Sequence, residues 1–376
     1  MVATYAPMIR VVHVLTRTNI GGPSVMLVDL LDGLDKTRVE QTVVRGAPIA
    51  SEGDYLERRT VNAEVITIGG LRRSLGVVGE LRSLFALVRT LRRLRPHIVH
   101  THMAKAGVIG RVAAVLARVP VRVHTYHGHL LHGYFSPLVT RVFTTVERVL
   151  RLVTTHALVV GAATRRDLLT ANVVKQQQSS TIMPAAKPMQ RHERNTARAA
   201  LGLPEHGVVV GFVGRLTDIK RPDRFIRLAH AVPGATFVVI GNGPLRDETV
   251  ASAASLNNVR VLDWHDDVAL VLSALDIVVL TSDNEGVPLS LIEASSAGVP
   301  VVSTDVGSVR EIVEHEVTGF VVTDEHALAD TVARLVDDAS LRTTMGERAR
   351  VNIAQRCSMQ AYLDAHIVLY EQLVRR

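Results

Sequence analysis

Residues 277–303 read IVVLTSDNEGVPLSLIEASSAGVPVVS. Two short apolar runs, Ile277–Leu280 and residues 300–303, are bounded by turn residues, as are strands buried on both faces of a parallel sheet. Between the two runs, Pro288 suits the first turn of a helix. The stretch therefore predicts a strand–helix–strand unit, with Glu285 in the loop at the carboxyl end of the first strand.

The same alternation continues along the whole chain. Further apolar runs predict strands at residues 11–15, 42–44, 63–66, 98–100, 121–124, 157–160, 208–213, 236–240, 259–262 and 319–322. Helical patterns between them include residues 79–95, 107–117, 221–230, 268–273 and 325–337. Strands that alternate with helices throughout a chain predict an α/β fold with parallel sheets.

The alternation is interrupted near residues 175–205, a polar segment that carries three prolines. This segment predicts a linker between two Rossmann-like domains, since 376 residues are long for one hydrophobic core. We expect a first domain at 1–185, a second at 186–355, and an amphipathic C-terminal helix at 356–376.

Composition restricts the class of protein. No apolar run approaches the roughly 18–20 residues of a transmembrane helix, and the opening MVATYAPMIRVVHVL predicts a first buried strand rather than a signal peptide. The single Cys357 excludes an internal disulfide. The net charge of +7 fits nucleic acid, an anionic membrane or a phosphate-bearing ligand, and the aromatic content of only 4% disfavours nucleic acid.

Ligands of open parallel sheets bind beyond the carboxyl ends of the strands, so the loops after strands are the candidate sites. Gly21 and Gly22 follow the first strand and precede Pro23. They would let the backbone approach a phosphate at a helix N-terminus, although an ordinary tight turn explains them as well. The segment does not match the G-x-G-x-x-G dinucleotide fingerprint.

Four histidines, His124, His127, His129 and His132, lie at and after the end of another predicted strand. Neither an H-E-x-x-H pattern nor a cysteine pair accompanies them, so we expect no metal site here. His127, which Gly128 follows, is the best candidate for a contact with a sugar hydroxyl. Local backbone hydrogen bonds are the alternative role for most of these histidines.

The second predicted domain opens with a strand that ends at Gly214, followed by Arg215 and, five residues later, Lys220. An arginine fork and a lysine point charge on one loop could grip a diphosphate. Two solvated surface cations are the alternative.

Glycines and the only tryptophan follow the next two strands. Gly243 permits close approach of the backbone to a flat ligand, and Trp264, after Asp263, could form a wall for a nucleotide base. Packing of Trp264 in the core remains an equal alternative.

Two glutamates complete the candidate site. Glu285 lies in the loop after its strand, and Glu293 lies one or two turns into the following helix, where a carboxylate can accept from ribose hydroxyls. Because the helix is apolar enough to be buried, these carboxylates need partners, which favours a functional role over two solvated glutamates.

These residues resemble glycosyltransferase family 4, a family of retaining enzymes with the GT-B fold. The matching segments are NIGGPS, HTYHGH, VGRLTDIKRPD, IGNGP, WHDDV and EGVPLSLIEASSAGVPVVSTDVGSVREIV, the last being the paired-glutamate signature. Their order and spacing agree from near residue 9 to the C-terminal helix. The resemblance implies two Rossmann-like domains that face each other across a cleft, with the C-terminal helix crossing back to the first domain.

The resemblance also implies a role for each position. Arg215 and Lys220 would neutralise the donor diphosphate, Glu293 would hold the ribose, and His127 would contact the donor sugar. Glu285 would hold that sugar too. The remaining implied donor-binding positions are Gly21, Gly22, Gly214, Gly243, Asp263, Trp264, Gly286, Val287, Pro288 and Leu289.

The implied activity is transfer of a hexosyl or N-acetylhexosaminyl group from a nucleotide diphosphate sugar to an acceptor hydroxyl, with retention and without a metal ion or other cofactor. UDP-sugars are favoured and GDP-sugars come second, in bacterial polysaccharide, glycolipid or natural-product glycosylation. Asp263 and Ser308 depart from the family pattern, so the donor stays open. A UDP-sugar epimerase, a phosphorylase or an inactive sugar-nucleotide-binding partner remain alternatives on the same fold.

We expect a cytoplasmic protein, with peripheral contact to the inner membrane face as an open alternative. The predicted helix that would make this contact carries Arg82, Arg89, Arg92, Arg93 and Arg95 beside leucine and phenylalanine side chains. A helix packed on the sheet with a solvated arginine edge explains the pattern equally well.

Overall fold

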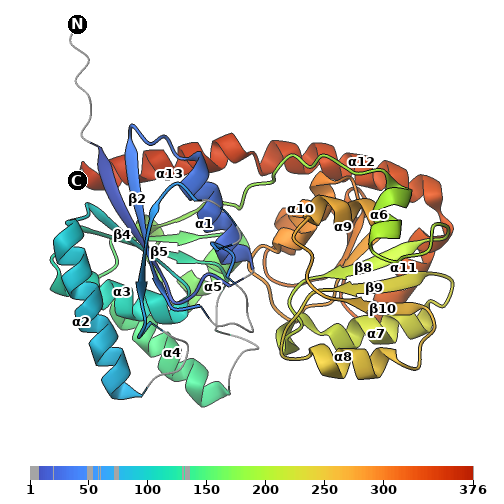
Figure 1. Cartoon of the computed structure of the whole chain (residues 1–376), viewed down its shortest axis with the longest axis horizontal. Coiled ribbons are helices and arrows are strands. Elements are labelled where there is room, and N and C mark those ends of the chain that lie inside the picture. Colours follow the sequence, from blue (N-terminus) through green and yellow to red (C-terminus); the bar gives the residue numbers. More distant parts are fainter. Residues whose placement is uncertain are drawn as a thin grey trace, which may run out of the picture. The chain divides into compact units, whose positions relative to one another are not determined.

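The computed structural model describes residues 8–19, 21–48, 54–57, 59, 61–71, 76–128, 131 and 136–375 (Figure 1). The chain divides into two compact units, each built on one parallel sheet. Unit 1 comprises Met1–Met183 and Gln360–Arg376, and unit 2 comprises Pro184–Met359.

The sheet of unit 1 has the strand order β3-β2-β1-β4-β5-β6-β7, and every pairing is parallel. The predicted strands are present, and β7 is a short addition from the segment that the sequence assigned to the linker. The strands are β1 (Ile9–Leu15), β2 (Val39–Gly46), β3 (Glu64–Ile68), β4 (Ile98–His102), β5 (Val121–Tyr126), β6 (His156–Val159) and β7 (Ser179–Thr181).

Helices cover both faces of this sheet. Alternate side chains of β1 show the division, since Val12 and Val14 share a core cluster with Leu87 and Ile109, while Leu15 packs with Leu27. The helices of unit 1 are α1 (Gly22–Gly33), α2 (Val77–Leu94), α3 (Ala104–Leu116), α4 (Pro137–Leu150), α5 (Ala162–Thr170) and α13 (Met359–Val374).

The C-terminal helix α13 packs against unit 1. The Tyr362 hydroxyl donates to the carbonyl of Met26 in α1 at 3.2 Å, and the Tyr370 hydroxyl lies 2.6 Å from Nδ1 of His100 in β4. Both tyrosines are buried. Together, α1 and α13 therefore cover one face of the sheet, and α2 and α3 cover the other.

Unit 2 repeats the pattern with the strand order β10-β9-β8-β11-β12-β13, again all parallel. Its strands are β8 (Val209–Val213), β9 (Thr236–Ile240), β10 (Val259–Leu262), β11 (Ile277–Leu280), β12 (Val301–Thr304) and β13 (Gly319–Val322). Its helices are α6 (Arg194–Ala200), α7 (Pro222–Ala231), α8 (Arg246–Ala253), α9 (Val268–Ala274), α10 (Leu289–Ser296), α11 (Glu325–Asp337) and α12 (Ala339–Arg356).

Both sheets contain a topological switch point, where connections from two neighbouring strands leave in opposite directions along the sheet. It lies between β1 and β4 in unit 1 and between β8 and β11 in unit 2. The loops diverge at such a point and leave room for a ligand beyond the carboxyl ends of the strands. The fold therefore places Gly214–Arg215 and the Glu285 loop at one switch point.

A buried arginine attaches α6 to the amino-terminal ends of β8 and β11, the two central strands of the unit 2 sheet. The Arg198 side chain is fully buried and donates to Asp276 Oδ2 at 2.6 Å, to Ala274 O at 3.1 Å and to Glu205 O at 2.9 Å. Asp276 directly precedes β11 and also accepts from the backbone N–H of Val209 in β8 at 2.7 Å. The guanidinium thus satisfies backbone carbonyls that would otherwise be buried without donors.

We predict that Arg198→Met lowers the free energy of unfolding of unit 2 by about 3 kcal/mol, because it leaves a largely buried carboxylate and several carbonyls without their donor. Urea unfolding followed by fluorescence of Trp264, the only tryptophan, reports on this unit. Arg348→Met, at an exposed position in α12, is the matched control. Equal unfolding midpoints for the two variants would contradict this account.

Candidate functional site

The loop that follows β11 is held to the loop that follows β8. The Thr281 hydroxyl donates to the carbonyls of Lys220 and Arg221 at 2.9 Å, and the Asp283 N–H donates to Ile219 O at 2.9 Å. On the other side, the Thr304 hydroxyl at the end of β12 donates to Ser282 O at 2.7 Å. Three strand ends therefore fix the position of the segment that leads into Glu285.

Within this frame, Glu285 and Lys220 form an ion pair. Lys220 Nζ lies 2.5 Å from Glu285 Oε1, and the Ser282 hydroxyl donates to the same oxygen at 2.6 Å. Glu285 is only 9% exposed, so its charge needs these donors. The sequence predicted both residues for the site but not their pairing, which brings a cation and a carboxylate together at the switch point.

Backbone packing defines the rest of this loop. Gly307, after β12, has φ +53°, and a Cβ there would lie 1.9 Å from the carbonyl oxygen of Glu285. The neighbouring Ser308 N–H donates to Gly286 O at 3.0 Å. The Ser308 hydroxyl is buried and has no hydrogen-bond partner among the described residues, a feature that a ligand or a water molecule can satisfy.

The helix after this loop begins next to Pro288, close to the predicted first-turn position. Pro288 is the N-cap of α10, and Leu289 is the first helical residue. Val287 is buried, and Glu293 lies half-buried in the second turn of the helix. The structure therefore keeps Glu285 and Glu293 on the same strand–loop–helix unit, as the sequence predicted.

The glycines after β8 and β9 serve loop packing. A Cβ at Gly241 would lie 1.9 Å from Gly214 O, and one at Gly243 would lie 2.3 Å from Leu216 O. Gly214 itself has only ordinary contacts, with 3.8 Å to the nearest atom. These approaches between two loops explain Gly243 without a ligand, while Arg215 lies half-buried beside them.

Asp263 and Trp264 lie at the end of β10, next to the β9 loop. Asp263 is exposed and accepts from Arg246 Nε at 2.8 Å and from Asn242 Nδ2 at 3.2 Å. Trp264 is half-buried, and its indole N–H donates to Asp266 at 3.3 Å. Trp264 is therefore not packed in the buried core, which was one of its two expected roles.

In unit 1, Gly21 and Gly22 lie at the start of α1, after β1. Gly21 has the extended φ of 160°, and a Cβ there would come no closer than 4.0 Å to Asn19 Nδ2. The backbone at Gly21 therefore does not require glycine. Ser24 fixes this turn because its hydroxyl donates to Asn19 O at 2.7 Å.

The strand-end histidines separate onto two faces of the sheet. His124 lies on the face of α3, where its Nδ1 is 2.9 Å from the Thr101 hydroxyl, whereas His127 lies beyond the end of β5 and contacts His102. His129 and His132 are outside the described residues. The structure thus retains His127 as a candidate and gives His124 a structural role.

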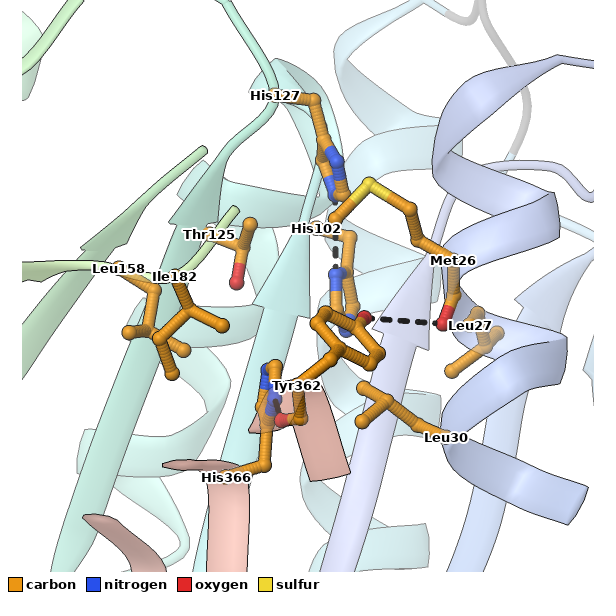
Figure 2. Close-up of a pocket in the computed structure, with 10 residues that line it drawn as sticks. All are labelled: Met26, Leu27, Leu30, His102, Thr125, His127, Leu158, Ile182, Tyr362 and His366. Atoms are coloured by element: carbon orange, nitrogen blue, oxygen red, sulfur yellow. Dashed lines mark hydrogen bonds between the residues drawn. The ribbon is translucent and has the colours of Figure 1, made fainter. Parts of the chain in front are cut away.

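His127 belongs to a cluster that the sequence analysis missed. His13 lies in β1 and His100 and His102 lie in β4, and their ring nitrogens come within 4.8 Å of one another. Figure 2 shows the outer part of this cluster, with the rings of His127 and His102 arranged end to end. The rings also stack, with centroids 4.3 Å apart for His100 and His102.

Each of these rings already has hydrogen-bond partners. His13 contacts Gln41 and His102 at 3.2 Å, His102 contacts His127 at 3.2 Å, and His100 contacts the Tyr370 and Thr125 hydroxyls at 2.6 Å. A metal ion would have to displace these bonds. We therefore interpret the cluster as a hydrogen-bonded network.

Burial keeps the network neutral. Desolvation lowers the pKa of His13 to about 3 and the pKa values of His127 and His366 to about 4. It lowers the pKa values of His100 and His102 well below the ordinary value. All of these imidazoles are thus uncharged near pH 7.

A cavity of about 210 Å³ opens beside His127 within unit 1. Its lining is mainly apolar, with Leu131, Phe143 and Leu168 among the contributors, and Glu147 provides a buried polar edge. Glu147 accepts from the Arg111 guanidinium at 2.8 Å and from the Tyr126 hydroxyl at 2.6 Å. This cavity can accommodate a largely apolar group next to a hydrogen-bonding edge.

Known proteins resemble the chain over most of its length. The family model described as glycosyl transferase 4-like domain matches residues 21–179, and that described as glycosyl transferases group 1 matches residues 193–352. One relative is the Escherichia coli UDP-Gal:alpha-D-GlcNAc-diphosphoundecaprenol alpha-1,3-galactosyltransferase, 27% identical over 85% of this chain and 86% of that protein. The Staphylococcus aureus capsular polysaccharide biosynthesis glycosyltransferase CapM is 24% identical over 87% and 90%.

Solved structures share the fold. Anabaena HepE in complex with UDP and glucose superposes with a TM-score of 0.82 at 22% identity, over 97% of this chain and all of that one. The sucrose-phosphate synthase of Thermosynechococcus elongatus gives 0.84 at 20% identity, over 97% and 99%. These similarities, with the two parallel sheets, give a GT-B fold.

We predict that unit 1 loses stability as the pH falls from 6.5 towards 4. The unfolded chain takes up protons with histidine pKa values near 6.5, whereas the buried histidines do not until the pH approaches their folded values. Each such histidine lowers the free energy of unfolding by about 1.4 kcal/mol per pH unit within this window. Hydrogen exchange of the β4 and β5 amides at pH 7 and pH 5 measures the effect, after correction for intrinsic exchange rates. Protection that is unchanged between the two pH values would contradict it.

Proposed function

This chain belongs to the GT-B glycosyltransferases of the group 4 type, and on that premise we propose that it transfers a sugar from a nucleotide diphosphate donor to an acceptor hydroxyl with retention. The observation that carries the proposal is the Lys220–Glu285 pair at the unit 2 switch point. An ammonium there can stabilise a departing diphosphate, and the carboxylate beside it can accept hydrogen bonds from sugar hydroxyls.

The proposed reaction exchanges one bond at the anomeric carbon for another. The bond between the sugar C1 and the β-phosphate oxygen breaks, and the acceptor oxygen bonds to C1 on the same face. The acceptor hydroxyl proton passes to the departing phosphate oxygen, and the nucleoside diphosphate leaves. Lys220 and Arg215 stabilise the charge that develops on the phosphate, and fixed charges of this kind are commonly the largest catalytic contribution.

Metal independence is part of the proposal. Two basic side chains, Arg215 and Lys220, follow β8 on one short segment, and two positive charges there are sufficient in kind to replace a divalent cation on the diphosphate. Activity that persists in EDTA and is not raised by Mg²⁺ or Mn²⁺ would support this part of the proposal, and activity that requires the cation would refute it.

For the donor, we propose a UDP-sugar, with a GDP-sugar second. The Escherichia coli relative is named as a transferase that uses UDP-Gal, and the Anabaena structure is a complex with UDP and glucose. For the pathway, we propose polysaccharide or glycolipid assembly, since the two relatives act on a diphosphoundecaprenol-linked sugar and in capsule synthesis by name. The apolar cavity beside His127 provides a candidate place for part of such an acceptor.

Lys220→Ala is predicted to lower kcat by roughly 10²–10³-fold, because it removes one charge from the leaving group. Truncation alone would also leave Glu285 buried without its cation, which could unfold the loop. The double variant Lys220→Ala/Glu285→Gln removes that imbalance, so we expect it to recover thermal stability and not activity. Lys187→Ala, at an exposed position, is the control for loss of a lysine.

Initial rates of sugar transfer and of donor hydrolysis, measured together, separate the alternatives. An epimerase would convert the donor without an acceptor, a phosphorylase would need inorganic phosphate, and an inactive partner protein would do neither. Unchanged turnover in Lys220→Ala would contradict the assignment.

We also propose that unit 1 contacts an anionic membrane surface. The chain has no helix among the described residues that could cross a bilayer. Helix α4 nevertheless exposes Leu138 (71%), Val142 (58%) and Val149 (60%), and α2 exposes Phe85 (68%). Large apolar side chains that remain exposed along two helices are typical of an interaction surface.

Basic side chains lie on the same two helices as these apolar side chains and favour an anionic membrane as the partner. Exposed arginines on α2 and α4 are Arg82, Arg89, Arg92, Arg93, Arg141 and Arg148, with Arg95 directly after α2. Helix α3 packs against both α2 and α4, and Arg92 donates to Leu116 O at 3.0 Å, so the three helices form one side of unit 1. Arginines beside exposed apolar side chains fit the phosphates and acyl boundary of anionic lipid.

Leu138→Asp/Val142→Asp should weaken binding to vesicles of phosphatidylcholine with phosphatidylglycerol by at least about tenfold, since two apolar side chains no longer enter the lipid. Flotation at low and high salt measures the binding. The matched control is Val250→Asp/Val351→Asp, which changes exposed valines of unit 2. Absence of wild-type binding at low salt, or equal binding of the two double variants, would refute the contact.

A further inference from the structure

Gln41 determines the direction of hydrogen bonding at the inner end of the histidine network. It lies buried in β2, and its side-chain amide nitrogen donates to the carbonyl of Leu30 at 3.0 Å. A carbonyl cannot donate, so the amide can have only this orientation. Its oxygen, Oε1, then faces His13 Nε2 at 3.2 Å, and that nitrogen must carry a proton.

The position of the proton on His13 determines the position of the proton on each of the next two rings. Because neutral His13 is protonated at Nε2, its Nδ1 is an acceptor for the Nε2–H of His102 at 3.2 Å. Neutral His102 then has an acceptor at Nδ1, which receives the Nε2–H of His127 at 3.2 Å. Burial keeps each ring neutral.

The series of hydrogen bonds ends at His127, where one ring nitrogen remains available as an acceptor. His127 Nδ1 is buried and has no hydrogen-bond partner among the described residues. His127 also contributes to the apolar cavity of unit 1 and to the small pocket of Figure 2.

We propose that Gln41, His13 and His102 are positioning residues that lock His127 in the Nε2–H tautomer, so that Nδ1 accepts a hydrogen bond from a hydroxyl of the bound sugar. This inference rests on the proposed function for the identity of the hydroxyl. If all three rings took the opposite tautomer, the two bonds between rings would persist in the reverse direction, but the lone pair of His13 Nε2 would face the lone pairs of Gln41 Oε1. If His127 alone took it, its Nε2 lone pair would face the lone pair of His102 Nδ1.

Gln41, at the inner end of this series of hydrogen bonds, limits what the histidine network can do. An amide neither releases nor takes up a proton near neutral pH, so protons cannot be relayed from His127 to solvent along this route. The arrangement therefore orients His127 and fixes its acceptor atom.

The network also accounts for the close grouping of His13, His100 and His102. In the derived tautomers, the Nδ1 lone pairs of His13 and His102 point at donor protons of neighbouring rings. A cation between the rings would need those lone pairs.

Nitrogen-15 NMR of the full chain labelled at histidine tests the proposal without any assay of activity. Long-range proton–nitrogen correlations distinguish a protonated ring nitrogen from an unprotonated one, and His127→Asn assigns the signals. We expect His127 to carry its proton at Nε2 in the wild type and to show a mixture of tautomers in Gln41→Met. A proton at Nδ1 in the wild type, or an unchanged single tautomer in Gln41→Met, would overturn the proposal.

Two substitutions at His102 then separate positioning from packing. In His102→Asn, the amide oxygen can replace the Nδ1 acceptor, whereas His102→Leu provides none. We expect His102→Leu to lower kcat by roughly 10–100-fold, the range found when a partner that orients a ligating histidine is lost, and His102→Asn to retain most of the rate and the tautomer. His156→Leu, another buried histidine of the same sheet, is the control.

Equal losses in His102→Asn and His102→Leu would overturn the positioning role. Absence of sugar transfer by the wild type would instead refute the proposed function, and the tautomer measurement would still decide whether the chain fixes His127.

Discussion

Two parallel strands, β8 and β11, lie side by side although their following connections run in opposite directions along the sheet. This arrangement leaves the carboxyl ends of both strands uncovered by long helices, and two connecting segments fill the gap, the first of which contains the short 3-10 helix Asp218–Lys220. Lys220 and Glu285 come from these two loops and neutralise each other at 2.5 Å. The hydroxyls of Thr281 and Thr304 hold the loops in register, so the position of the pair depends on the topology of the sheet.

The switch point of unit 1 carries uncharged histidines, whereas that of unit 2 carries an ion pair. In unit 1 the switch point lies between β1 and β4, and the histidines that surround it come from these strands and from the end of β5. The parallel register places His13 opposite His100, and side chains two residues apart share a face, which brings His102 into the same row. Neutral hydrogen bonds therefore fix the orientation of a side chain in unit 1, whereas an ion pair does so in unit 2.

Much of the fold could be predicted from the sequence because buried parallel strands are short apolar runs. The Glu285 loop could also be predicted, from its glycine, proline and glutamates. The histidine network could not be read in the same way. His13 and His102 are far apart in the chain, and only strand order and register bring them together. The exposed apolar face of α4 is a different case, since Leu138, Val142 and Val149 have helical spacing in the sequence, but spacing alone does not distinguish a buried apolar face from an exposed one.

The central claim is that the two loops at the unit 2 switch point hold the nucleotide sugar. Hydrogen–deuterium exchange of the wild-type protein with and without UDP-glucose tests this claim directly. The account predicts slower exchange in residues 214–220 and 281–289 when the donor is bound, with the Glu285 segment among the most protected. Binding that leaves both segments unchanged, while other parts of the chain become protected, would contradict it.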